Sequence, residues 1–143
     1  TAQWTGGQWV MREAMNSDNN YDRGAFSVER DGSWRLYAPT TSGPQPGSPG
    51  GEVVLWESKN EGGLWNRVHA LTAGSEFNHG FVRRPLNAHP EFSAFWADGH
   101  ARRPSESRLY FCNADGSRVW RLPERMEGDF AVPASMADDT TSR

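Results

Sequence analysis

The sequence predicts an all-β fold made of about two and a half four-stranded antiparallel blades of a β-propeller. Three observations predict it. Short segments rich in aromatic and β-branched residues recur along the 143 residues, with glycine-containing turns between them. Helical periodicity is not visible. Trp9, Trp65 and Trp120 lie 56 and 55 residues apart, and each follows a turn that itself follows an aromatic strand. A repeat of this length with four strands is typical of a propeller blade.

The predicted elements follow in chain order. Residues 3–15 are expected to form a hairpin around a Gly-Gly turn. A first complete blade is predicted over 19–72, with strands near 23–29, 33–38, 52–57 and 65–71. A second is predicted over 78–123, with strands near 79–84, 92–97, 108–112 and 118–122. The partial propeller is expected to span 1–133, and the small, polar residues 134–143 are expected to form a frayed tail.

Two and a half blades do not close a ring, because propellers use about 4–8 blades. The sequence therefore predicts that the remaining blades come from the same longer chain or from other copies, which would cover the open strand edges. The turn 40–51 joins the second and third strands of the first blade and is rich in proline and glycine. It has two interpretations, a solvated loop and a loop that carries binding contacts.

Composition excludes several classes of protein. A net charge of -3 argues against a general nucleic-acid binder. No apolar run of about 18 residues is present, so no membrane span is expected, and no signal-peptide pattern precedes the first predicted strand. A single cysteine, Cys112, excludes an internal disulfide framework. Residues 79–125 are locally cationic, and all their basic residues are arginine, which suits carboxylate binding but also fits a codon bias.

One turn carries a resemblance to a known family. The segment Ser58-Lys59-Asn60-Glu61-Gly62-Gly63-Leu64-Trp65 resembles the Asp-box of BNR-repeat proteins, with Asn60 in place of the usual aspartate. Residues 17–24, 43–46, 50–52, 78–90, 95–99 and 107–111 resemble a group of bacterial BNR-repeat proteins. The resemblance implies the seven-bladed, sialidase-like superfamily and, more distantly, polysaccharide lyases such as ulvan lyases. It further implies an extracellular or periplasmic bacterial protein that binds an acidic polysaccharide.

Two polar clusters mark the first strand of each blade, one at 19–23 and one at 78–84. Asn20 and Asn78 lie 58 residues apart, which is one repeat, so the clusters are expected side by side around the propeller axis. β-Elimination on a uronate needs a base, a cation on the carboxylate and an acid for the leaving oxygen. The candidate catalytic residues are His79, Tyr21, Arg83 and Arg84. The candidate substrate-binding residues are Asn20, Asn78, Asp22, Arg23 and His89.

Alternatives stay open at this point. His79 has a second interpretation as a loop-packing residue, and only one of Arg83 and Arg84 can face the channel, so the other is expected to pair with a neighbouring blade. Sialidase-like hydrolysis is an alternative reaction, because residues 82–85 resemble the Arg-Ile-Pro segment of sialidases. A glycan-binding or scaffold propeller without catalysis is another. No metal site is predicted firmly; Asp18, Asn19 and Asp22 are the oxygen ligands that Ca²⁺ would use.

Overall fold

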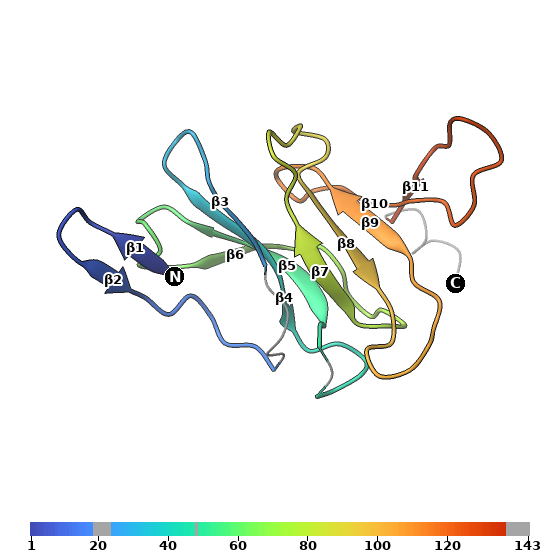
Figure 1. Ribbon diagram of the computed structural model, residues 1–143, viewed down its shortest axis with the longest axis horizontal. Helices are drawn as coiled ribbons and strands as arrows, with labels where there is room; N and C mark the ends of the chain where they lie inside the picture. The colour runs from blue at the N-terminus through green and yellow to red at the C-terminus, as the bar shows by residue number, and fades with distance from the viewer. Residues whose placement is uncertain (19–23, 48, 137–143) are drawn as a thin grey trace.

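The computed structural model describes residues 1–18, 24–47 and 49–136, which form three antiparallel sheets and no helix (Figure 1). None of these residues therefore lies in a helix that could cross a membrane. The first sheet is the hairpin of β1 (Ala2–Trp4) and β2 (Trp9–Met11). The all-β prediction is confirmed, and the two larger sheets coincide with the predicted blades.

The first blade is the meander of β3 (Ala25–Val28), β4 (Trp34–Thr41), β5 (Glu52–Ser58) and β6 (Asn66–Ala70). The second blade has the order β11-β10-β9-β8-β7. Its strands are β7 (His79–Arg83), β8 (Ala94–Asp98), β9 (Leu109–Cys112), β10 (Val119–Arg121) and β11 (Ala134–Ser135). Glycine-containing turns join several neighbouring strands, because glycine adopts the positive φ of a tight turn without a steric penalty.

The tail predicted over 134–143 does not begin where the sequence suggested. Ala134 and Ser135 pair with β10, and the Met136 N–H donates a hydrogen bond of 3.0 Å to Val119 O. The Met136 side chain packs against the buried core, which gives this short segment an apolar anchor. The second blade therefore has a fifth strand, while residues 137–143 lie outside the described part of the chain.

The hydrophobic core lies between the two blades. Alternate residues of each strand point to one face, and the facing sides of the two sheets meet there; the buried residues are Ala25, Tyr37, Val53, Leu55, Leu71, Val82, Ala94, Trp96, Tyr110 and Cys112. The Tyr37 hydroxyl, which is fully buried, donates to Ala114 O at 2.8 Å and lies 3.1 Å from Ser93 Oγ. Each blade therefore covers the apolar face of the other.

The spacing of the tryptophans matches the length of the repeat, but Trp65 and Trp120 do not take the same place relative to their strands. Trp120 pairs with Phe111 inside β10, whereas Trp65 precedes β6, whose first pair is Asn66 with Glu57. Trp120 is the second residue of its strand, whereas Trp65 directly precedes its strand, so the two tryptophans do not occupy equivalent positions.

Candidate functional site

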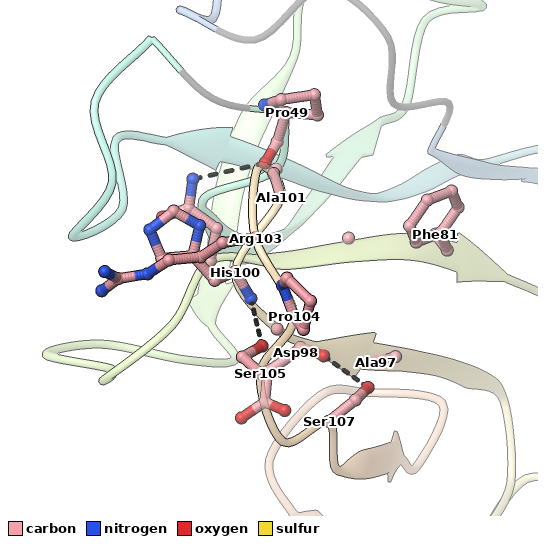
Figure 2. A pocket seen from close by; sticks show the side chains of 14 residues that line it. Pro49, Phe81, Ala97, Asp98, His100, Ala101, Arg103, Pro104, Ser105 and Ser107 are labelled. Atoms are coloured by element: carbon pink, nitrogen blue, oxygen red, sulfur yellow. Dashed lines mark hydrogen bonds between the residues drawn. The ribbon is translucent and has the colours of Figure 1, made fainter.

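A pocket of about 480 Å³ lies where β7 begins, at the contact of the two blades (Figure 2). Three segments line it: residues 49–50 of the β4–β5 loop; Asn78, Gly80 and Phe81 at the start of β7; and residues 97–101, 103–105 and 107 at the end of β8 and in the following loop. This volume is within the usual range of small-molecule sites. Of the predicted second polar cluster, Asn78 lines the pocket, whereas Arg83 and Arg84 lie at the other end of β7.

Asn78 holds the β4–β5 loop against β7. Its Oδ1 accepts the Gln45 N–H at 3.0 Å, and its Nδ2 donates to Gln45 O at 3.0 Å and to Pro49 O at 3.3 Å. The Gln45 side-chain oxygen Oε1 in turn accepts the Asn78 backbone N–H at 2.8 Å. Asn78 is 4% exposed. Asn78, a predicted substrate-binding residue, thus lines the pocket, but its side-chain amide is hydrogen-bonded to the β4–β5 loop.

The β4–β5 loop is a wall of the pocket rather than a free, solvated connection. Gly51 pairs with His79 through two backbone hydrogen bonds of 2.9 and 2.8 Å. The Arg102 guanidinium, which comes from the second blade, donates to Gly47 O. These contacts favour the second interpretation of the 40–51 turn, in which it carries part of a binding site.

His79 is buried in a hydrogen-bonded chain and does not line this pocket; it borders a second cavity, together with Ser75 and Tyr110. The Trp96 indole N–H donates to Nδ1 at 3.1 Å, which requires that nitrogen to be unprotonated. The Nε2–H then donates to Ser75 Oγ at 2.8 Å, and Ser75 Oγ donates to Glu52 Oε2 at 2.9 Å. Burial lowers the pKa of His79 below its ordinary value, although the nearby Glu52 opposes the shift. The ring is therefore neutral at pH 7.

The hydrogen bonds of His79 leave neither ring nitrogen open to a substrate proton. Its imidazole instead connects the 72–78 loop to the second blade, because Ser75 lies in that loop and Trp96 in β8. The Thr72 hydroxyl and the Ser75 N–H also donate to Glu52, at 2.5 and 2.9 Å. The contacts of His79 thus correspond to its loop-packing interpretation.

The stability of the protein should fall in acid because of His79. A lowered pKa means that the fold favours the neutral imidazole, so its contribution is complete above the unfolded value of 6.5 and is lost as the pH falls below it. Urea unfolding at several pH values should show this decline in wild type. His79→Gln should flatten the dependence, whereas the same change at the exposed His69 should preserve it. An equal slope in His79→Gln would contradict the assignment.

The predicted arginines lie at the other end of β7. Arg83 ends the strand, about 13 Å from its start at ~3.3 Å per residue. Arg84 donates to Ser93 Oγ at 2.7 Å and forms an ion pair of 3.3 Å with Glu29 of the first blade. The predicted pairing of one arginine with a neighbouring blade is confirmed. Arg83 is exposed, and its guanidinium donates to Val82 O at 2.8 Å.

His89 does not belong to the pocket. It lies in the β7–β8 connection, at the end of the sheet opposite the pocket, because antiparallel neighbours place successive connections at alternate ends. Its Nδ1 accepts the Glu91 N–H at 3.1 Å, so the ring shapes its own turn. The substrate-binding prediction for His89 is therefore not supported by its position.

Four predicted site residues, Asn20, Tyr21, Asp22 and Arg23, lie outside the described residues, as does Asn19 of the suggested Ca²⁺ site. Their placement beside Asn78 stays a prediction. Within 1–18, 24–47 and 49–136, no group of three or more His, Cys, Asp or Glu residues is arranged to hold a metal ion.

The pocket contains two basic residues that the sequence reasoning did not select. Arg103 makes no hydrogen bond or ion pair with any other described residue. The His100 Nδ1 accepts the Arg102 N–H at 3.2 Å, so in the neutral ring the proton lies on Nε2. Both come from the β8–β9 loop, which lies at the same end of the sheet as the start of β7. The sequence signal that would have found them is the Arg102-Arg103 pair in a loop predicted at the same end of the sheet as Asn78.

The carboxylate nearest to the pocket does not neutralise Arg103. Asp98 lines the pocket, yet its side chain accepts the Arg108 N–H at 2.6 Å and the Tyr110 hydroxyl at 2.9 Å. The Arg108 guanidinium adds an ion pair of 3.5 Å. Burial, followed by the bond to Asp98, raises the pKa of Tyr110 to about 12, so this hydroxyl remains a donor. The charge that faces the pocket is therefore positive.

No family model matches the chain, and neither a curated protein nor a solved structure matches it significantly.

Proposed function

We propose that this chain is part of a carbohydrate-active β-propeller that cleaves a uronate-containing acidic polysaccharide by β-elimination outside the cytoplasm. One observation carries the proposal. The pocket at the start of β7 presents the Arg103 guanidinium, without an acidic partner among the described residues, together with the His100 ring. A guanidinium binds a carboxylate with two parallel hydrogen bonds. The resemblance of the Asp-box and of residues 78–90 to BNR-repeat proteins supports the same class of substrate.

The chemistry assigns a role to each basic group. Elimination removes the C5 proton of the uronate, forms a C4–C5 double bond and breaks the C4–O bond to the next sugar. Arg103 binds the uronate carboxylate and stabilises the negative charge that develops as the proton leaves. The protonated His100 imidazolium donates its Nε2 proton to the leaving oxygen and becomes the neutral ring. Tyr21 is the remaining sequence-predicted group to accept the C5 proton, and His79 positions the loop.

The outer face of the second blade supports the expectation of further blades. Phe95, Phe111 and Trp120 pair side by side across β8, β9 and β10, on the face turned away from the first blade. The Phe111 and Trp120 rings stack at 5.0 Å, and Phe95 is 38% exposed. A broad apolar face of this kind is typical of a protein contact. Another blade, from a longer chain or another copy, would cover it.

The test is the ultraviolet absorbance of the unsaturated uronate that elimination creates, measured with the complete propeller on a panel of acidic polysaccharides. His100→Gln and Arg103→Ala should each lower the rate by about 10²–10⁴, the usual effect of removing an acid or a charge-stabilising donor. Arg30→Ala is the matched control, because Arg30 is exposed in the β3–β4 turn, away from the pocket, and should leave the rate unchanged.

Two results would replace the proposal with an alternative. Release of reducing ends without the absorbance would indicate a sialidase-like hydrolase. Binding of the polysaccharide without any turnover, in a protein with all its blades, would indicate a glycan-binding or scaffold propeller. Unchanged rates in both pocket variants would place the chemistry elsewhere.

A further inference from the structure

Phe81 has a backbone conformation that its residue type rarely adopts. Its φ is 58°, in the left-handed region, where a bulky side chain is an outlier. The residue lies in a register shift of β7, between the pairs Gly80–Ala97 and Arg83–Phe95. Its ring is nevertheless 71% exposed and lines the pocket. The strain of this conformation is therefore not compensated by full burial of the ring.

The backbone of the bulge is more strained with phenylalanine than with residues that adopt a positive φ readily. The extra residue lets Val82, which is 0% exposed, turn into the core between the blades. Glycine would adopt the same φ without steric cost, and asparagine would do so more easily than an aromatic residue. An exposed aromatic ring at a strained position beside a pocket therefore points to a role in binding, since backbone strain is characteristic of ligand sites.

Figure 2 shows how this ring lies relative to the basic groups. Phe81 stands at one end of the pocket, on β7, while the His100 and Arg103 side chains lie at the other end, on the β8–β9 loop. A ligand that contacts both ends must extend along the pocket. A single charged sugar ring bound at Arg103 would leave the phenylalanine uncovered.

We propose that Phe81 is a sugar-stacking residue that binds the ring next to the uronate held by Arg103. The aromatic face covers the C–H face of that second ring, which removes apolar surface of both partners from water. This inference rests on the proposed function and specifies its substrate. The pocket recognises an acidic oligosaccharide of at least two rings, one by its charge and the neighbouring one by its apolar face.

The test compares two probes and two variants by isothermal titration calorimetry or, for weak binding, by NMR titration. The probes are glucuronic acid, a single charged ring, and a hyaluronan tetrasaccharide, in which uronate and neutral rings alternate. Arg103→Ala should weaken the binding of both. Phe81→Gly should lower the affinity for the tetrasaccharide about tenfold, the effect of one lost aromatic contact, and leave the affinity for glucuronic acid unchanged. Phe81→Tyr keeps the ring and should bind both probes like wild type.

A stability measurement separates a binding ring from a structural one. Since glycine relieves the left-handed conformation, Phe81→Gly should unfold at an unchanged or higher urea midpoint. A lower midpoint, or an unchanged tetrasaccharide affinity, would overturn the role of Phe81 while leaving the proposed function intact. If wild type binds neither probe and no other acidic glycan, the proposed function fails, and this inference fails with it.

Discussion

Replacing Trp96 with alanine should lower the free energy of unfolding by about 3–5 kcal/mol, the usual cost of removing a buried large aromatic side chain. Trp96 is 1% exposed and lies at the centre of the contact between the blades. Its ring stacks on Tyr110 at a centroid distance of 6.1 Å, and its N–H donates to His79. The substitution removes both contacts at once and leaves a cavity where the two sheets meet.

Urea unfolding followed by circular dichroism measures this effect, with Trp9→Ala as the matched control. Trp9 is 64% exposed, so its removal should change the free energy of unfolding by less than about 0.5 kcal/mol. Trp96→Phe retains most of the ring but no indole N–H, and should fall between the two. If Trp96→Ala unfolded like wild type, the blades would not share a core at this residue.

Replacing Gly50 with alanine should strongly destabilise the loop that forms the pocket wall. Gly50 has a φ of +83°, and an added Cβ would lie within 2.3 Å of the His79 carbonyl oxygen. The left-handed conformation costs alanine about 1–2 kcal/mol, and overpacking against backbone adds about 1–3 kcal/mol. Because Gly51 pairs with His79, the loop must move away from β7, and binding at the pocket should weaken with it.

Gly74→Ala isolates the two parts of this cost. Gly74 has a φ of +65°, but nothing lies within 4 Å of the position of its added Cβ. Gly74→Ala should therefore lower the free energy of unfolding only by the cost of the left-handed conformation, about 1–2 kcal/mol. Urea midpoints of both variants, together with a glycan-binding titration, measure the difference. Equal losses in the two variants would mean that the β4–β5 loop does not lie against β7.

Local features of the fold were predictable from short stretches of sequence. In the turn between β5 and β6, Asn60 Oδ1 accepts the Leu64 N–H at 2.8 Å, and Gly62 has a φ of +79°. The two residues form this turn through contacts with their own neighbours in the chain. The positions of the strands other than β11 also followed, since alternation along each segment depends on which face is buried and not on the identity of the partner.

The sequence by itself determined that this chain is all-β and where the strands of its two larger sheets lie, apart from β11. Only the tertiary structure decided what the predicted site residues do. Asn78 and His79 are predicted site residues whose polar atoms bond to a loop, while Arg103 and Phe81 line the pocket from two different segments. The reason is physical: a turn is specified by contacts a few residues apart, whereas a free guanidinium or a satisfied imidazole depends on contacts between segments distant in the chain.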